Sequence, residues 1–407
     1  MAGPLQLTFV NYKKDSYIVV EGKSNADRFY IIRQGKVRLF KDVEVVEEEG
    51  GSVLGPGDFF GVVSTMSSHS QIETAQAITE VTLISVIKEQ YGQLIQNNTP
   101  VAMKIILQFS KRMRYLDEAL TRLTLKSNAD ENVTHLYKVA EYYTRQSQYN
   151  QAFYAYHQYI KHCPDGGNVS KAREIMMKIG PYAKAVKLDF KSEEFNRVYP
   201  KDCMIFSEGE PGEELFIIQK GSVKIAKIVD NNEVLLAVLK IGDIFGEMAL
   251  LESKPRAACA VAYEECHVMA VNRANFERMV STQPQIVARL TTLLAERIWF
   301  IYKQLANTLI NDPMGRMYDA LMMQLEKNRI DINSFAHTFD FGPKELVNMV
   351  GIPQGEGTMI LRKLMENKKI QIIKDKDKDK IHSLDVSDIA KQSAMYKKLQ
   401  KIGRTPT

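Results

Sequence analysis

The sequence predicts a multidomain α+β protein. We expect two β-rolls that are each followed by a long helix, a helical insert between them, and a C-terminal helix-turn-helix module. Three observations lead to this prediction. A segment with short β-type runs occurs twice, at an offset of about 185 residues. Each copy ends in an apolar stripe with helical spacing. The last quarter of the 407 residues holds short helical segments separated by glycine and proline.

Matching strings establish the duplication. DRFYIIRQGKV begins at Asp27 and corresponds to ELFIIQKGSV at Glu214, and GDFFG at Gly57 corresponds to GDIFG at Gly242. Both copies have runs of Val, Ile, Phe and Tyr between glycines and aspartates, which is typical of antiparallel strands joined by tight turns. The predicted domains are 1–125 for the first roll with its helix, 126–187 for the insert, 188–311 for the second roll with its helix, and 312–407 for the C-terminal module.

Each roll is followed by an apolar stripe with spacings of three and four, as in a heptad seam. The first stripe consists of Ile106, Phe109, Met113, Leu116, Leu120 and Leu123, and the second consists of Leu290, Leu294, Ile298, Ile301, Leu305 and Leu309. Such a helix can pack on its own domain or pair with another helix, either in a second chain or within the same chain. The sequence leaves these alternatives open.

The insert has the residue spacing of one tetratricopeptide repeat. The residues at this spacing are Leu136, Val139, Ala140, Tyr143, Ala152, Tyr156, Ile160 and Pro164. A single repeat cannot bury its apolar face without neighbours. We therefore expect a helical spacer that packs against the rolls. A docking surface for a protein partner is the alternative.

The second copy contains the string FGEMALLESKPRAA, which begins at Phe245. Gly246 permits a tight turn, and the next five residues are good helix formers, so a short helix can present free N–H groups to a phosphate. Arg256 can bind phosphate oxygens with a planar, fully charged fork. Glu247 can accept a hydrogen bond from a ribose hydroxyl and partly balances the arginine.

This string resembles the phosphate-binding cassette of cyclic-nucleotide-binding domains, as found in the regulatory subunits of cAMP-dependent kinases and in Crp/Fnr-type regulators. The resemblance implies that Glu247 holds the ribose 2′-hydroxyl and that Arg256 holds the cyclic phosphate. Small residues would complete the cradle with their backbones. The predicted ligand-binding residues are Gly246, Glu247, Met248, Ala249, Arg256, Ala257, Ala258 and Tyr302.

The ligand is expected to be cAMP, with cGMP as the alternative. Cys259 stands where cGMP-selective relatives often carry Thr, and a thiol is a poor hydrogen-bond donor to guanine. Tyr302 lies on the predicted long helix, where Crp-type proteins place small hydroxyl residues against adenine. Its ring could stack on the purine, or this face of the helix could be plain core.

The first copy lacks both charged groups of the cassette. Val62 stands in place of Glu247, Gln71 in place of Arg256, and Glu73 in place of Ala258. An anionic ligand would meet a carboxylate and no arginine there. We expect that the first roll binds no cyclic mononucleotide and that it has a structural or pairing role.

The C-terminal module starts where Asp312 can cap a helix whose first residue is Pro313. A short helix at 343–350, a turn at Gly351 and a helix from Pro353 to about Glu366 predict a helix-turn-helix. The segment 368–383 predicts a two-stranded wing, with the alternating Lys/Asp run 374–380 as a solvated tip. The net charge of +5 arises entirely from the segment after Asp312, which contains 17 Lys and Arg and 12 Asp and Glu.

This order resembles the winged helix of Crp/Fnr regulators and implies binding to double-stranded DNA. The start of the recognition helix departs from the usual Ser-Arg-Glu, with Pro353, Gln354 and Gly355 in those places. Gln could read adenine, whereas basic residues could contact phosphates without reading sequence. The predicted DNA-binding residues are Gln354, Thr358, Arg362, Lys363, Lys368 and Lys369.

The whole sequence thus predicts a cAMP-binding transcription regulator in which the second roll controls the winged helix. A homodimer is expected if the DNA site is a palindrome. The alternative is a cAMP-binding signalling adaptor that binds a protein through the insert and does not read DNA. The sequence shows no nucleophile–base constellation and no P-loop, so no catalytic activity is expected.

Composition excludes other classes of protein. Hydrophobic residues make up 45% of the sequence and charged residues 25%, as in ordinary globular proteins. The four cysteines and seven histidines are dispersed, so we expect neither a metal site nor a disulfide framework. No apolar run approaches the length of about 18 residues that a membrane span needs, and the start lacks a signal-peptide pattern. We therefore expect a cytoplasmic protein without membrane contact.

Overall fold

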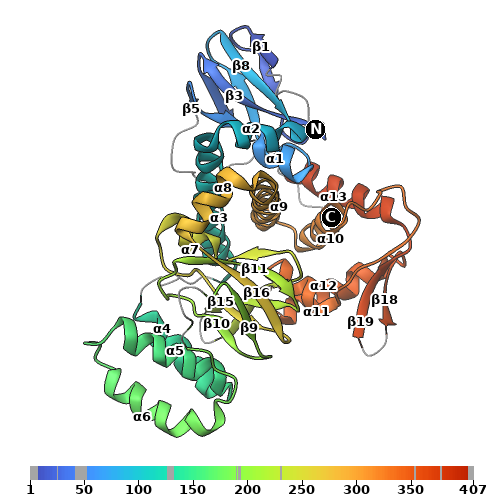
Figure 1. Ribbon diagram of the computed structural model, residues 1–407. Coiled ribbons are helices and arrows are strands. Elements are labelled where there is room, and N and C mark those ends of the chain that lie inside the picture. Colours follow the sequence, from blue (N-terminus) through green and yellow to red (C-terminus); the bar gives the residue numbers. More distant parts are fainter. Residues whose placement is uncertain are drawn as a thin grey trace. The chain divides into compact units, whose positions relative to one another are not determined.

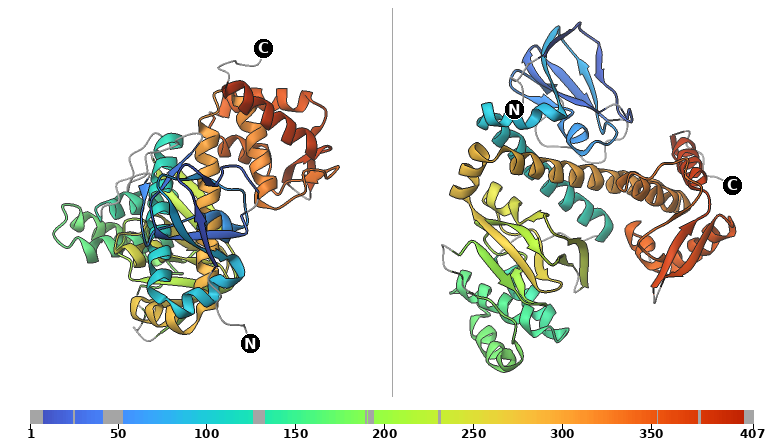
Figure 2. Two further views of the ribbon diagram at one scale, coloured as in Figure 1. Left: turned by 90° about the horizontal axis from the view of Figure 1, so that it is seen from above. Right: turned by 45° about the vertical axis from the view of Figure 1, so that its right-hand side comes forward.

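The computed structural model describes residues 8–24, 26–41, 53–125, 133–188, 190, 194–229, 232–352, 354–375 and 378–401 (Figures 1 and 2). The chain forms two compact units. The described part of the first unit comes from Glu89–Tyr115 and Ser127–Leu294, and that of the second unit comes from Gln6–Lys88, Leu116–Lys126 and Ala295–Thr407. The first unit thus contains the second β-roll and the insert, and the second unit contains the first β-roll and the C-terminal module.

The β-roll of the second unit consists of two four-stranded sheets, with strand orders β1-β8-β3-β6 and β2-β7-β4-β5. Its core is formed by inward-facing residues such as Ile32, Val37 and Leu83. The strands are β1 (Thr8–Tyr12), β2 (Tyr17–Val19), β3 (Arg28–Gln34), β4 (Val37–Phe40), β5 (Val53–Leu54), β6 (Phe59–Phe60), β7 (Thr74–Ala77) and β8 (Val81–Ile87).

The β-roll of the first unit repeats this plan, with orders β9-β16-β11-β14 and β10-β15-β12-β13. Each strand occupies the same place in its sheet as the strand eight numbers earlier, which confirms that the two copies share one β-roll topology. The strands are β9 (Asn196–Tyr199), β10 (Met204–Phe206), β11 (Glu214–Lys220), β12 (Val223–Val229), β13 (Asn232–Leu239), β14 (Ile244–Phe245), β15 (Cys259–Ala262) and β16 (Cys266–Asn272).

The helices of the two rolls correspond in the same way. The first copy has α1 (Val62–Ser67), a 3-10 turn (Lys88–Gln90), α2 (Tyr91–Asn97) and α3 (Thr99–Leu125), and the second has α7 (Glu247–Glu252), α8 (Arg273–Thr282) and α9 (Pro284–Thr308). Most residues of the two predicted stripes are buried. Leu123, at the end of the first stripe, is half-exposed. The predicted long helices are therefore present.

The insert consists of α4 (His135–Arg145), α5 (Tyr149–His162), α6 (Val169–Ile179) and a 3-10 turn (Gly180–Tyr182). Its helices lie beside the second β-roll, in green in Figure 1. Their buried tyrosines and alanines form one core with Met204, Ile228, Cys259 and Val261 of the roll. The insert packs against this roll, which is one part of the expected packing against both rolls.

The C-terminal module contains α10 (Pro313–Lys327), α11 (Pro343–Met349), α12 (Gln354–Glu366) and α13 (Val386–Lys401), with β17 (His337–Thr338), β18 (Ile370–Asp375) and β19 (Lys378–Ser383). Asp312 caps α10, because its Oδ1 accepts from the N–H groups of Met314 and Gly315 at 2.8 and 3.0 Å. Gly351 has a φ of 62°, as the predicted turn requires. Pro353 lies outside the described residues.

The alternating Lys/Asp run lies at the end of the β18–β19 hairpin, where Lys374, Asp375, Lys378 and Asp379 are exposed, as predicted for a solvated tip. Unlike a loop, five of its seven residues belong to the paired strands. Lys374 faces Asp379, and Asp375 faces Lys378 in the antiparallel register. Opposite charges across an antiparallel pair attract each other, so alternation on both strands favours pairing. The other two residues of the run lie outside the described part of the chain.

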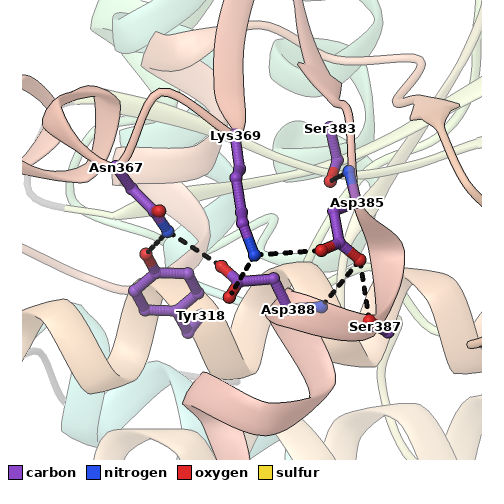
Figure 3. Close-up of polar contacts among 7 residues, drawn as sticks. All are labelled: Tyr318, Asn367, Lys369, Ser383, Asp385, Ser387 and Asp388. Carbon is purple, nitrogen blue, oxygen red and sulfur yellow. Dashed lines mark hydrogen bonds and ion pairs between the residues drawn. The ribbon is translucent and has the colours of Figure 1, made fainter.

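Helix α13 is anchored by a polar cluster shown in Figure 3. Lys369 Nζ contacts Asp385 Oδ2 at 2.9 Å and Asp388 Oδ1 at 3.0 Å. Asn367 Nδ2 donates to Tyr318 Oη at 2.7 Å and to Asp388 Oδ2 at 2.9 Å. The hydrogen bond from Ser387 and the charge of Lys369 lower the pKa of Asp385 to about 2. The cluster joins the last helix to the end of α12 and to α10.

Within the described part of the chain, no helix is both long and apolar enough to cross a membrane.

Candidate ligand-binding site

The cassette of the second roll is a short helix between two left-handed residues. Gly246 has a φ of 75° and turns the chain from β14 into α7, and Ser253, with a φ of 54°, ends α7. Gly246 fits this place because residues with a Cβ rarely adopt positive φ. The chain then returns to β15 through Arg256, so the two ends of the cassette meet. Arg256 Nη1 donates to the carbonyl of Gly246 at 2.6 Å.

Arg256 is a buried cation with unused hydrogen-bonding capacity. Its side chain is almost fully enclosed, and its guanidinium lies over the ring of Phe206 at 4.3 Å from the centroid. Burial lowers the pKa of Arg256, and the nearby charges of Glu210, Glu214 and Glu247 oppose this. Its Nε is buried and has no hydrogen-bond partner in the described part of the chain. A buried N–H without an acceptor is unfavourable, so the site fits an anionic ligand.

Two glycines leave room for the guanidinium. A Cβ at Gly212 would collide with Nε and Cζ of Arg256, and it would lie 2.7 Å from Cβ of Ala249. A Cβ at Gly246 would lie 2.7 Å from Arg256 Nη1. A Cβ essentially never has contacts this short, so a side chain at either position would force the arginine or its neighbours to shift.

The predicted ligand residues of the first unit lie together. Glu247 is buried in the first turn of α7, where its charge opposes the lowering of the Arg256 pKa by burial. Ala249 is buried beside the guanidinium. Tyr302 belongs to the second unit, where Lys41 Nζ lies 4.8 Å from its ring centroid. Its stacking on a purine stays a prediction. The remaining cassette residues, Met248, Ala257 and Ala258, are half-buried next to these groups.

Glu210 is a site residue that sequence reasoning missed. Its backbone carbonyl accepts from the N–H of Arg256 at 2.8 Å. Its carboxylate is half-buried, and desolvation raises the pKa of Glu210 to about 7. The sequence held a signal, because the acidic, glycine-rich string EGEPGEE at 208–214 lies between two strands. Glu214, in the same string, forms two hydrogen bonds of 2.7 Å with Arg197.

The first roll keeps the backbone of the cassette but not its charges. Gly61 has a φ of 78° and Ser68 a φ of 54°, which match Gly246 and Ser253. Gln71 occupies the place of Arg256, because its carbonyl accepts from Gly22 at 2.8 Å as that of Arg256 accepts from Gly209 at 2.9 Å. The side chains of Val62 and Gln71 carry no charge, so this cassette has no group equivalent to the Glu247–Arg256 pair.

The long helix of the first roll contacts the cassette of the second within the first unit. Arg114 Nε of α3 forms an ion pair with Glu252 Oε2 at 3.0 Å, and Ser110 Oγ donates to Glu252 Oε1 at 2.7 Å. Both charged side chains are almost completely buried. Two guanidinium nitrogens of Arg114 also donate to the Pro255 carbonyl at 3.3 Å. The residue just before Arg256 is therefore held by α3.

The predicted DNA-binding residues lie on α12 and just after it. Thr358, Arg362, Lys363 and Lys368 are exposed. Lys369 is paired with two aspartates, so among these residues the structure favours it least as a phosphate contact. Gln354 is the first residue of α12, and its side chain lies outside the described part of the structure. A Cβ at Gly357 would collide with the Val347 methyl groups, so this glycine permits the close crossing of α11 and α12.

No group of three or more His, Cys, Asp or Glu residues that could hold a metal ion occurs in the described ranges.

Comparison with known proteins identifies the two rolls. The cyclic nucleotide-binding domain family matches residues 9–98 and 196–283. A CRP-like cAMP-activated global transcriptional regulator of Mycobacterium tuberculosis is 28% identical over 155 residues, which cover 38% of this chain and 69% of the relative. The cyclic AMP receptor protein of Thermus thermophilus is 34% identical over 103 residues, which cover 25% of this chain and 48% of the relative.

A third relative is the cAMP-activated global transcriptional regulator CRP of Salmonella typhimurium, which is 30% identical over 126 residues. These residues cover 30% of this chain and 60% of the relative. The chain therefore contains two cyclic nucleotide-binding domains and is similar to transcription regulators of the CRP type.

Proposed function

We propose that this chain is a cAMP-responsive transcription regulator, with one working ligand site in its second β-roll. The observation that carries the proposal is the buried Arg256, whose Nε lacks an acceptor and whose guanidinium lies close to Glu247. In this proposal Arg256 and the backbone of the cassette bind the cyclic phosphate, and Glu247 accepts a hydrogen bond from the ribose. The chain acts as a binding protein and not as an enzyme.

Titration calorimetry with cAMP and cGMP tests the ligand site. We expect one cAMP per chain, weaker binding of cGMP, and loss of binding in Arg256→Ala. The matched control is Gln71→Ala in the first roll, which should leave the stoichiometry and the affinity unchanged. Two sites per chain, or an Arg256→Ala variant that binds like the unmodified protein, would contradict the proposal.

The second part of the proposal is that residues 312–407 form a winged helix that binds double-stranded DNA, with α12 in the major groove. Arg362 and Lys363 are exposed on α12, and the net positive charge of the chain arises from this module. Contacts of this kind bind phosphates and position the protein without reading bases. Because the chain has one such module, reading a palindrome requires a homodimer.

Fluorescence anisotropy with duplex DNA over a range of salt concentrations tests this part. Each phosphate contact contributes about one unit to the slope of log affinity against log salt concentration, so Arg362→Ala with Lys363→Ala should reduce the slope by about two. The control replaces two exposed lysines of α13, Lys391 and Lys398, and should change the slope less. If cAMP binds but DNA does not bind at any salt concentration, the chain is the signalling adaptor.

A further inference from the structure

The helical insert contributes side chains that contact the ligand-binding roll next to the cassette. Tyr154 of α5 donates a hydrogen bond to Glu210 Oε1 at 3.1 Å, and its hydroxyl also lies 3.2 Å from the Ile205 carbonyl. Two further contacts join α4 of the insert to the same roll, because Tyr143 Oη donates to Glu233 Oε1 at 3.0 Å and His135 Nε2 lies 3.6 Å from Glu208 Oε1. The insert therefore touches the turn on which Glu210 and Gly212 lie.

Both carboxylate oxygens of Glu210 have partners. Oε1 accepts from Tyr154, and Oε2 accepts from the backbone N–H of Ser207 at 2.9 Å. Two cations act on this carboxylate, Arg256 and Lys161 of α5, and both lower its pKa. Arg256 is the more buried of the two and is bonded to the Glu210 backbone. A half-buried carboxylate that lost one hydrogen bond would turn to another donor, and of the two cations that act on it Arg256 has the larger effect.

Arg256 is not bonded to this carboxylate. Its Nη1 donates to Gly246, and its Nε has no partner in the described part of the chain, although Glu210 lies within electrostatic range. An ion pair between Arg256 and Glu210 would occupy the N–H group that the phosphate needs. The orientation of Glu210 thus decides whether the arginine is available to an external anion.

We infer that Tyr154 of the insert is a positioning residue for the cyclic-nucleotide site: its hydroxyl holds Glu210 away from Arg256 and so keeps the guanidinium available for the phosphate. The inference rests on the proposed function. It makes the insert part of the binding site and more than a spacer, although Tyr154 does not touch the ligand. The second roll without its insert would retain Arg256 but would bind cAMP more weakly.

The experiment measures the cAMP affinity of the full chain by titration calorimetry. Tyr154→Phe is made in two backgrounds, the unmodified chain and the Glu210→Gln variant. In the unmodified background, Tyr154→Phe should weaken binding about tenfold, which corresponds to one hydrogen bond to a charged group. In the Glu210→Gln background, the same substitution should change the affinity less than about twofold, because the neutral amide does not compete for Arg256. Glu210→Gln alone should bind at least as tightly as the unmodified chain.

The control is Tyr159→Phe on the same helix. The Tyr159 hydroxyl accepts a hydrogen bond from the N–H of Asn168 inside the insert, so this substitution loosens the insert without touching Glu210. Its cAMP affinity should equal that of the unmodified chain.

Three results would overturn the inference. Unchanged affinity in Tyr154→Phe would show that the hydroxyl does not act on the site. An equal loss in both backgrounds would show that Tyr154 only stabilises the roll, as would an equal loss in Tyr159→Phe. If the unmodified chain binds no cAMP, the proposed function itself fails and the inference fails with it. If the unmodified chain binds and the two backgrounds respond alike, only the inference fails.

Discussion

At the scale of single residues, the proposed ligand site depends on one buried cation, Arg256, whose Nε has no hydrogen-bond partner in the described part of the chain. Arg256 is enclosed by Phe206 and by two glycines whose missing side chains make room for it. A buried charge is unfavourable unless it is paired, and the folded chain leaves Nε of this arginine without an acceptor, so an anionic ligand would stabilise it. The space around Arg256 is therefore as much part of the site as the arginine itself.

Gly212→Ala tests this requirement for space. The backbone at Gly212 is not in the left-handed region, so alanine is tolerated by the backbone itself and only the collision with Arg256 opposes it. We expect cAMP affinity to fall at least tenfold, with a loss of stability of about 1–3 kcal/mol from overpacking. Calorimetry and urea unfolding measure both quantities. The control is Gly55→Ala, where an added Cβ meets no atom within 4 Å; equal behaviour of the two variants would refute the argument.

The sequence allowed part of this site to be predicted. Glu247 and Arg256 could be recognised because they lie in one string of 14 residues with known chemistry. Tyr154 could not be recognised, because the contact that joins it to Glu210 spans 56 residues and depends on how the insert packs. A tyrosine at helical spacing is ordinary core material in a sequence, and only the structure shows that its hydroxyl reaches a half-buried carboxylate.

At the scale of secondary-structure elements, the position of the cassette is fixed by a helix from the other copy of the repeat. Arg114 of α3 pairs with Glu252 at the end of α7 and donates to the carbonyl of Pro255. The heptad-like stripe predicted α3 but could not show what it packs against. The ion pair is invisible in the sequence, because the two residues are 138 positions apart.

Arg114→Ala should destabilise the first unit by about 3 kcal/mol, because it removes the buried cation from Glu252 and leaves only the exposed Lys254, at 3.9 Å. Urea unfolding measures this effect. Lys178→Ala is the control, since Lys178 and Glu174 form a pair of 2.6 Å that is exposed to solvent and should contribute far less to stability. If both variants lose the same stability, the buried pair does not hold the cassette.

The C-terminal elements show where local rules suffice and where they fail. The start of α10 was predictable because an aspartate cap followed by proline is a local signal. The exposure of the alternating Lys/Asp run was predictable, but the pairing of most of the run was not, because attraction across two strands is a property of pairing. A glycine inside a helix normally destabilises it, but Gly357 lies against Val347, where a side chain would not fit.

At the scale of the whole molecule, the two copies of the repeat share individual contacts as well as the fold. Arg114 and Trp299 occupy equivalent places on the two long helices, at the repeat offset of about 185 residues. In the first unit Arg114 donates to the carbonyl of Pro255, and in the second unit Trp299 Nε1 donates to the carbonyl of Ser70 at 3.3 Å. Pro255 and Ser70 are themselves equivalent residues of the two cassettes. Each long helix thus contacts the cassette of the other copy, within one chain.

Because each long helix contacts the cassette of the other copy within one chain, we predict that cAMP binding needs no second chain. If the helix partner of the cassette came from another subunit, dilution would separate the two and weaken binding by mass action. Here Arg114 and the cassette belong to the same chain, so we expect the dissociation constant for cAMP to be independent of protein concentration. The measurement is cAMP affinity by fluorescence polarisation over a wide range of protein concentrations, with the mass of the species followed by light scattering. Affinity that rises together with dimer formation would show that the cassette is completed between chains. If a monomer binds cAMP with an affinity that does not depend on protein concentration, a dimer is required only for DNA recognition.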